Sequence, residues 1–258
     1  MELGLKDRVV VITGGATGIG KATALEFLRE GAKLAICSRR QSVLDDAKAE
    51  FNELGFDIFC KSVDVTDYKA FETFAEEVKQ HLGRIDIWVN NAGSNKIKSM
   101  MEYAPDEFDS IIKTNLYSVF YGCQIAARHM MPQSKGVILN AASFAALAPN
   151  AGRAPYSAAK SGVLSLTRTF AAELAPYGIR VLSYVPGMIR TDISVNSISK
   201  YGDKLLRDIP VRRFGKPEDL AKVIVFMASD AADYVNGTHF EVSGGKRCVQ
   251  NPWYGYDG

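Results

Sequence analysis

The chain alternates seven short, β-branched segments with stretches of helical periodicity along most of its 258 residues. The segments expected to be strands are residues 8–12, 33–37, 57–63, 85–89, 136–141, 179–185 and 238–242. Helices are expected over residues 18–30, 42–54, 67–82, 105–131, 156–175 and 217–229. Because strand–helix–strand crossovers are right-handed and make neighbouring strands parallel, the alternation predicts a doubly wound α/β fold, with a seven-stranded parallel sheet flanked by helices.

Composition and charge exclude several classes of protein. Hydrophobic residues make up 47% of the chain and charged residues 23%, and the net charge is +2. These values are ordinary for a globular protein and give no reason to expect nucleic acid as a partner. No apolar run reaches the roughly 18 residues of a membrane span, and the N-terminus lacks a signal-peptide core. We therefore expect a cytoplasmic protein with no membrane partner.

The cysteines and histidines give no indication of a metal site. Cys37, Cys60, Cys123 and Cys248 are scattered, with no Cys-x-x-Cys pair, and the three histidines are equally dispersed. Neither metal-ligand spacing nor a disulfide framework is present. We expect no bound metal, and burial of the cysteines as small apolar side chains.

The first expected strand runs into a glycine-rich turn, Thr13-Gly14-Gly15-Ala16-Thr17-Gly18-Ile19-Gly20. Glycine lets a backbone turn tightly and approach a pyrophosphate closely, and the helix that follows offers free N–H groups to phosphates. The pattern G-x-x-x-G-x-G differs from the common fingerprint G-x-G-x-x-G, but it lies in the first strand–helix unit, where a dinucleotide site belongs. The turn therefore favours phosphate binding over a simple glycine-rich connector.

Tyr156 and Lys160 are four residues apart, and so lie one turn from each other on one helix face. A free phenol has a pKa of about 10, and a neighbouring ammonium lowers that value. A tyrosine tuned in this way can exchange a proton with a carbonyl or carbinol oxygen. Taken alone, such a pair is more often exposed, or is a lysine lying along an aromatic face. The motifs elsewhere in the chain favour the catalytic interpretation.

With these residues the chain resembles the short-chain dehydrogenase/reductase family from about residue 6 to residue 245. The resemblance rests on motifs in the family's order: the glycine-rich turn, Asn90-Asn91-Ala92-Gly93, Asn115, Ser143, Tyr156-x-x-x-Lys160 and Pro186-Gly187. It implies a single-domain, Rossmann-like fold. It also implies an oxidoreductase that interconverts a carbonyl and a secondary alcohol by hydride transfer with a nicotinamide cofactor.

The resemblance also implies residue roles. Tyr156 would be the general acid/base, Lys160 would lower its pKa and bind the nicotinamide ribose, and Ser143 would hold the substrate oxygen. Asn115 would order a water that links Lys160 to solvent. The predicted cofactor-binding residues are Gly14, Thr17, Gly18, Ile19, Gly20, Ser38, Arg39, Arg40, Asp64, Val65, Asn91, Ala92, Gly93, Tyr156, Lys160, Pro186, Gly187, Ile189 and Thr191.

The substrate pocket is expected after the fourth, fifth and sixth strands. Its candidate residues are Ser94, Asn95, Phe144, Ala145, Leu147, Asn150, Arg153 and Met188. Half of these residues are apolar and half are polar, and small-molecule pockets combine apolar walls with a few polar groups. Arg153 either meets an anionic group or caps the start of the Tyr156 helix, and the sequence does not choose between these roles.

The end of the second strand bears on the choice of cofactor. NAD-preferring enzymes place a carboxylate there to accept from the ribose 2′-OH, but this chain reads Ser38-Arg39-Arg40. An arginine fork suits a 2′-phosphate, so we predict NADP(H), with NAD(H) as the alternative. Thr17 stands where some NADP-dependent members carry a basic residue, which weighs against the preference.

Two further segments carry predictions. Residues 189–214 form a long, irregular stretch beside the site and are predicted to be a substrate lid. The tail, residues 246–258, is rich in glycine and aromatic residues and is expected to pack across a subunit interface. The family implies a homotetramer or homodimer.

The predicted activity is NADP(H)-dependent interconversion of a small-molecule ketone and its alcohol, leaning towards general ketone or 3-oxoacyl reduction. The alternatives are an NAD-dependent dehydrogenase of sugars, polyols or other alcohols, and a dinucleotide-sensing protein without turnover. A sensor has no need of Asn115, Ser143, Tyr156 and Lys160 together, so these residues favour an enzyme.

Overall fold

One parallel sheet organises the chain, in a computed structural model that describes residues 2–192, 194–246 and 248–257. The strand order is β3-β2-β1-β4-β5-β6-β7, and each neighbouring pair is parallel. The strands are β1 Val9–Thr13, β2 Lys33–Ser38, β3 Phe59–Ser62, β4 Ile87–Asn90, β5 Gly136–Ala141, β6 Ile179–Pro186 and β7 His239–Val242. This arrangement confirms the predicted doubly wound α/β fold.

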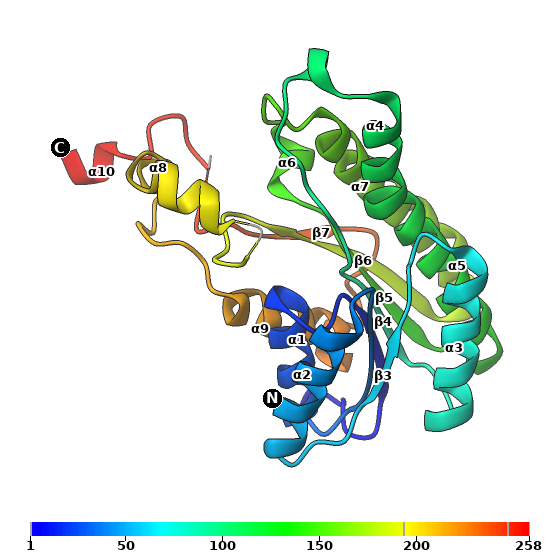
Figure 1. The fold of residues 1–258 in the computed structure, drawn as a ribbon. Coiled ribbons are helices and arrows are strands. Elements are labelled where there is room, and N and C mark those ends of the chain that lie inside the picture. The colour runs from blue at the N-terminus through cyan, green and yellow to red at the C-terminus, as the bar shows by residue number, and fades with distance from the viewer. Residues whose placement is uncertain (1, 193, 247, 258) are drawn as a thin grey trace.

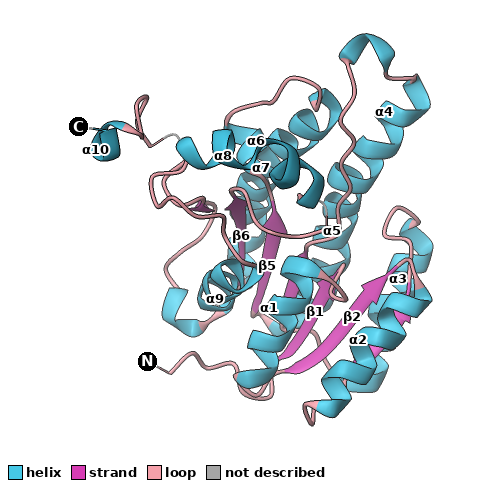
Figure 2. Cartoon of the chain, turned by 60° about the vertical axis from the view of Figure 1, so that its left-hand side comes forward, coloured by secondary structure: helices cyan, strands magenta, loops and turns pink. Residues whose placement is uncertain are grey.

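Helices cover both faces of the sheet (Figures 1 and 2). The helices on one face are α1 Gly18–Arg29, α2 Gln41–Glu53 and α9 Pro217–Ala228. Those on the other are α3 Tyr68–Leu82, α5 Ser118–Met130 and α7 Ala154–Leu174. The sequence of β1 is continuously apolar because both faces of the strand are buried. Val10 and Ile12 pack against the layer of α1, α2 and α9, whereas Val9 and Val11 pack against the layer of α3, α5 and α7. Burying each such side chain contributes roughly 1.5–3 kcal/mol.

The strand order reverses at β1, which pairs with both β2 and β4. In a doubly wound sheet the crevice outside the carboxyl ends of the strands opens at such a reversal. The glycine-rich turn follows β1, and the Asn90-Asn91 motif follows from the end of β4. The topology therefore brings the two motifs together at one edge of the sheet.

The helix expected over residues 105–131 is interrupted. It consists of α4 Pro105–Ile112, a π-helical turn Lys113–Tyr117 and α5. Asn115 lies in this turn, where its Nδ2 donates to the carbonyl oxygens of Ile111 and Ser94 at 2.9 and 2.8 Å. A π-turn inside a helix is often found at functional sites, and this one brings the Asn115 amide to the loop that follows β4.

The 189–214 segment is not irregular as predicted, because it contains helix α8, Val195–Arg207, with non-helical backbone angles at Tyr201. Ser194, Asn196, Ser197, Ser199 and Gly202 are weak helix formers, which hid the helix from sequence reasoning. No described residue of α8 is buried. The helix therefore lies on the molecule rather than within it (Figure 1).

The C-terminal tail contains a short helix, α10 Tyr254–Asp257, beside the segment that follows α8 (Figure 1). The Tyr256 hydroxyl donates to the Pro210 carbonyl oxygen at 2.7 Å, and the Arg212 guanidinium lies 4.3 Å from the centre of the Tyr256 ring. Within one chain, the tail is thus attached to the end of the α8 segment.

Candidate active site

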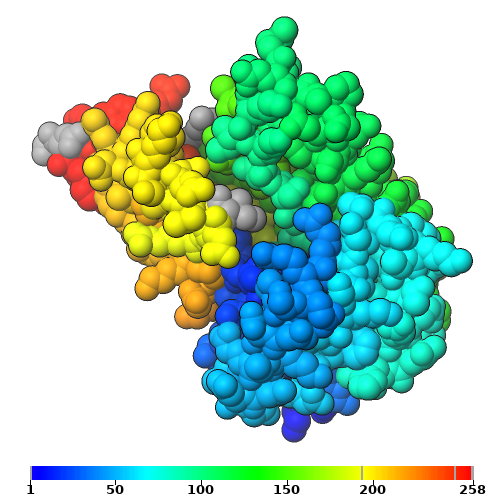
Figure 3. All heavy atoms as spheres, viewed as in Figure 1, coloured from blue at the N-terminus to red at the C-terminus, as the bar shows by residue number. Residues whose placement is uncertain are grey.

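A cleft of ≈ 580 Å³ opens at the carboxyl ends of the strands. Figure 3 shows a hollow in the surface between the yellow residues, which include α8, and the green residues. Most of the predicted cofactor residues line it, together with two substrate candidates and Asn115. These are Gly14, Thr17, Gly18, Ile19, Gly20, Ser38, Arg39, Arg40, Asp64, Val65, Asn91, Ala92, Gly93, Ser94, Asn95, Asn115, Tyr156, Lys160, Pro186 and Thr191.

Other predicted residues do not line this cleft: Ser143, Phe144, Ala145, Leu147, Asn150, Arg153, Gly187, Met188 and Ile189. Ile189 differs most from its predicted place beside the nicotinamide. Its side chain is buried in the core, where it packs so closely on Gly215 that a Cβ there would lie 2.4 Å from the Ile189 Cδ1. Gly187 likewise packs against the backbone of Ser243.

Several residues that sequence reasoning missed also line the cleft: Cys37, Val63, Thr114, Ala141, Ala142, Tyr184 and Asp192. Most of them lie in the last residues of a strand or directly after one. Extending each motif by one or two positions along its strand would have found them. Tyr184 had no such signal, because it lies within the apolar run of β6.

The glycine-rich turn fits a dinucleotide phosphate. Gly14 and Gly18 have φ angles of +64° and +52°, which favour glycine. A Cβ on Gly20 would lie 2.2 Å from the Gly14 carbonyl oxygen, so only glycine allows the turn to close. Thr17 makes no side-chain cap on α1, and the first turn holds no acidic residue. The helix N-terminus therefore presents uncapped N–H groups and a positive dipole end beside the cleft.

Asn91 links the end of β4 to this turn. Its Nδ2 donates to the carbonyl oxygens of Thr13 and Gly14 at 3.0 and 3.2 Å. Its Oδ1 accepts from the buried Tyr184 hydroxyl at 3.0 Å. The backbone N–H groups of Asn91 and Ala92 both donate to the Thr13 hydroxyl at 2.9 Å. These bonds fix the floor of the cleft before any ligand enters.

At the adenosine end, Ser38, Arg39 and Arg40 lie together on the cleft wall. Both arginines are exposed, and neither side chain makes an ion pair with any residue that the structure describes. Asp64 is held locally, since its Oδ1 accepts from the N–H and hydroxyl of Thr66 at 2.9 and 2.7 Å. Two unpaired guanidinium groups are thus available to a ligand.

Lys160 is 3% exposed, and its Nζ donates to the Ala141 carbonyl oxygen at 2.7 Å. Burial lowers the pKa of Lys160 from 10.5 to about 8. The same Nζ lies 5.8 Å from the centre of the Tyr156 ring. The helix spacing therefore delivers the side-by-side arrangement that the sequence predicts.

The electrostatics of Tyr156 differ from the prediction that Lys160 lowers its pKa. Burial raises the pKa of Tyr156, while a hydrogen bond with Ser143 and the charge of Arg153 oppose the increase. Ser143 also begins a short helix, α6 Phe144–Leu147, by accepting from the Ala145 N–H at 3.1 Å. The structure thus brings Ser143 and Tyr156 together as predicted, but burial outweighs the nearby charges.

Asn115 and Lys160 approach each other across Gly93. A Cβ at Gly93 would lie 2.9 Å from the Asn115 Oδ1 and 3.8 Å from the Lys160 Nζ. The Asn115 Oδ1 also accepts from the Ser94 N–H at 3.3 Å. The π-turn, the loop after β4 and the start of α7 therefore meet at this end of the cleft.

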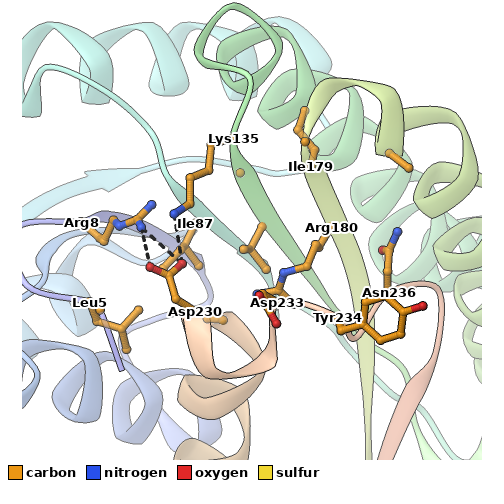
Figure 4. Close-up of a pocket in the computed structure, with 16 residues that line it drawn as sticks. Leu5, Arg8, Ile87, Lys135, Ile179, Arg180, Asp230, Asp233, Tyr234 and Asn236 are labelled. Carbon is orange, nitrogen blue, oxygen red and sulfur yellow. Dashed lines mark hydrogen bonds and ion pairs between the residues drawn. The ribbon is translucent and has the colours of Figure 1, made fainter. Parts of the chain in front are cut away.

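A second pocket, of ≈ 470 Å³, lies at the amino ends of the strands (Figure 4). Its charged groups largely pair with one another. The Asp230 carboxylate forms ion pairs with Arg8 and Lys135, each at 3.1 Å. Arg180 donates to the carbonyl oxygens of Met227, Ser229 and Val235 at 3.0, 3.0 and 3.1 Å. These contacts hold β6 against the end of α9 and the segment that follows it. The charged groups of this pocket therefore have a structural role.

A phosphate-binding turn at the reversal of a doubly wound sheet, with a tyrosine and a buried lysine in the same cleft, is the arrangement of a nicotinamide-dependent oxidoreductase. The comparison with protein families agrees, because the short chain dehydrogenase model matches residues 8–202. The chain belongs to the short-chain dehydrogenase/reductase family. It is thus an enzyme that acts on CH–OH groups with NAD(P).

Characterised relatives cover nearly the whole chain. It is 38% identical over 241 residues to a 3-oxoacyl-(acyl-carrier-protein) reductase of Thermotoga maritima, spanning 93% of this chain and 98% of that protein. It is 36% identical to a 3α-hydroxysteroid dehydrogenase of Mediterraneibacter gnavus, spanning 96% and 100%. The solved structure of a levodione reductase superposes with a TM-score of 0.91 at 32% identity, covering 95% of this chain and 99% of the other.

The described part of the chain has no helix that is both long and apolar enough to cross a membrane.

Proposed function

We propose that this protein is an NADP(H)-preferring oxidoreductase that interconverts a small-molecule ketone and its secondary alcohol, with Tyr156 as the general acid/base. The observation that carries the proposal is the cluster of Ser143, Tyr156 and Lys160, in which Ser143 is hydrogen-bonded to Tyr156 and the Lys160 Nζ lies 5.8 Å from the centre of the Tyr156 ring. Tyr156 and Lys160 line the cleft, and perturbed titratable groups in a cleft are typical of catalytic sites.

The bound nicotinamide supplies or accepts the hydride. In the reductive direction, negative charge grows on the carbonyl oxygen as the hydride arrives, and the hydroxyls of Ser143 and Tyr156 donate hydrogen bonds to it. Tyr156 then transfers its proton to that oxygen. Lys160 would bind the nicotinamide ribose. Asn115 orders the water that links Lys160 to solvent.

The preference for NADP(H) rests on Arg39 and Arg40, which line the cleft without a carboxylate partner in the described residues. No carboxylate ends β2, so the ribose 2′-OH of NAD would lack its usual acceptor. Two unpaired guanidinium groups favour a 2′-phosphate instead, because arginine binds phosphate bidentately.

The substrate class is supported by what the relatives are named for. A 3-oxoacyl thioester, a 3α-hydroxysteroid and levodione all present a ketone or a secondary alcohol. The proposed substrate wall consists of Ser94, Asn95, Phe144, Asn150 and Met188, with Ala145, Leu147 and Arg153. Asn95 contributes a buried Oδ1 that has no hydrogen-bond partner among the described residues, and it could accept from a substrate hydroxyl.

Helix α8 and the exposed aromatic face of α5 support two structural proposals. We infer that residues 189–214 close over the substrate as a helical lid on a single domain, because α8 has no buried residue. We also infer a homotetramer or homodimer. Phe120 of α5 is 36% exposed and packs at a tilt against Phe170 of α7, with 5.9 Å between ring centres, leaving an apolar face for a second copy.

The test measures NADPH and NADH binding by fluorescence, and then consumption of the reduced cofactor with ketones, 3-oxoacyl thioesters and sugars. Tight NADPH binding with turnover of a ketone is the expected result. Binding without turnover of any carbonyl would favour a sensor. Turnover with NADH and polyols alone would favour the NAD-dependent alternative.

A further inference from the structure

Resting on the proposed function, we propose that Arg153 binds a carboxylate of the substrate, so that the enzyme acts on oxo acids rather than on neutral ketones. Arg153 directly precedes α7 and lies three residues before Tyr156. Arg153 is the N-cap residue of α7, and Tyr156 lies in the first turn of the same helix. The same end of α7 therefore carries both the guanidinium and the Tyr156 hydroxyl.

The surrounding loop holds Arg153 in place. The Gly152 carbonyl oxygen accepts from the Lys98 N–H at 3.0 Å and from the Tyr103 hydroxyl at 3.4 Å. The Arg153 carbonyl oxygen accepts from the Ser157 N–H at 2.9 Å. The loop before α7 is thus fixed to the loop after β4, and together they wall the substrate side of the site.

The position of the charge is unfavourable without a ligand. Arg153 is half-buried, it makes no side-chain cap, and its side chain forms no hydrogen bond or ion pair with any described residue. Its cation lies at the positive end of a 21-residue helix whose first turn holds no acidic residue. Helix dipoles favour anions there, and a partly desolvated unpaired charge is costly. A carboxylate would relieve both penalties.

Other cations near the mouth are already used. Glu107 forms ion pairs with both Lys96 and Lys98, the latter at 2.7 Å. Lys246 lies 5.3 Å from the centre of the Phe144 ring. Asp192, a carboxylate of the cleft, follows Thr191, which packs near Gly18 at the phosphate end. Among these groups Arg153 supplies the planar fork that matches a carboxylate.

The alternative role, in which Arg153 caps the start of α7, is not supported, because its side chain makes no capping hydrogen bond. The remaining alternative is that Arg153 acts only on Tyr156, whose pKa its charge lowers. The two roles predict different kinetics. Loss of an anion-binding residue affects acids more than their esters, whereas loss of a residue that only tunes Tyr156 affects both equally.

The experiment compares pyruvate, acetoacetate and 4-oxopentanoate with their methyl or ethyl esters, using NADPH and initial rates. Wild type should favour at least one acid over its ester. Arg153→Gln should reduce kcat/KM for that acid, mainly through KM, by roughly 10- to 100-fold more than it reduces kcat/KM for the ester. Arg153→Lys should restore part of the loss. Arg168→Gln, an exposed arginine on the same helix, should behave as wild type.

Three results would overturn the proposal: an ester preferred by wild type, turnover of neutral ketones only, or equal losses for acid and ester in Arg153→Gln. If wild type reduces nothing in the panel, the reductase function itself fails for these substrates, and binding decides the carboxylate site. Calorimetric titration of the NADPH complex with 3-hydroxybutyrate should then give binding that Arg153→Gln abolishes. Absence of binding to wild type would exclude the site.

Discussion

At the scale of single residues, identity and spacing were predictable but environment was not. The sequence places Lys160 one turn from Tyr156, yet only the fold shows that desolvation moves their pKa values in opposite directions. Arg153 shows the same limit: its two roles could not be separated until the structure showed an uncapped helix and an unpaired guanidinium.

Lys160 should destabilise the folded protein below pH 8. Its pKa falls from 10.5 to about 8 on folding, and below pH 8 it is charged in both states, so the buried charge costs about 3 kcal/mol. Between pH 8 and 10.5 the folded state releases the proton first, and the penalty disappears as pH rises. The stability advantage of Lys160→Met over wild type should therefore shrink by about 2 kcal/mol between pH 7 and pH 10.

Urea unfolding of both proteins at the two pH values measures this difference. The lost hydrogen bond to the Ala141 carbonyl oxygen shifts the variant equally at every pH, so the pH dependence isolates the charge. A difference that stays constant with pH would show that Lys160 is not desolvated in the folded state.

Arg39→Asp should reverse the cofactor preference. Losing a charge-assisted hydrogen bond to the 2′-phosphate, and adding repulsion, should raise the KM for NADPH by roughly 10- to 100-fold. The KM for NADH should stay level or fall, because the new carboxylate can accept from the ribose 2′-OH. Steady-state kinetics with both cofactors gives the ratio, with Arg168→Asp as control. An unchanged ratio of the KM for NADPH to the KM for NADH would show that Arg39 does not bind the 2′-phosphate.

At the scale of elements, strands and most helices were predictable because their apolar periodicity survives in the sequence. Strand β5 matches its predicted bounds, residues 136–141. Two helices were misread for physical reasons. The helix over 105–131 is interrupted by the π-helical turn Lys113–Tyr117, which no periodicity reveals. Helix α8 is rich in weak helix formers and packs on the surface.

The C-terminal tail, residues 246–258, should hold the proposed lid, residues 189–214, in position. Tyr256 attaches α10 to Pro210 and Arg212, at the end of the α8 segment. Tyr256→Ala removes the hydrogen bond and the cation–π contact, each contributing about 1 kcal/mol. The KM for the carbonyl substrate should rise about threefold to tenfold, with little change in NADPH affinity, and Tyr256→Phe should have a smaller effect. Unchanged KM in both variants would mean that the attachment does not position α8.

At the scale of the whole molecule, topology determined the location of the site before any residue was assigned a role. Seven alternating units predict the parallel sheet, and its order places the reversal beside β1. Assembly was not predictable, because the apolar face of the Tyr156 helix, with Ala158, Gly162, Leu166 and Phe170, is equally compatible with core packing and with an interface.

Because the cleft joins segments from β1, β2, β4, β5, β6 and α7, cofactor binding should stabilise the whole fold. At 100 times its dissociation constant, NADPH should add about 2.7 kcal/mol to the free energy of unfolding. For a chain of this size that raises Tm by roughly 5–11 °C. Thermal unfolding with equal NADPH and NADH concentrations measures the shift. A larger shift with NADH would contradict the proposed preference.

The most direct test of the central claim is Tyr156→Phe, assayed for both NADPH binding and carbonyl reduction. Phenylalanine keeps the ring and loses only the hydroxyl that gives its proton to the carbonyl oxygen. The account predicts unchanged NADPH affinity with kcat reduced by at least roughly 100-fold. Turnover near the wild-type rate, with the cofactor bound normally, would show that Tyr156 is not the general acid/base.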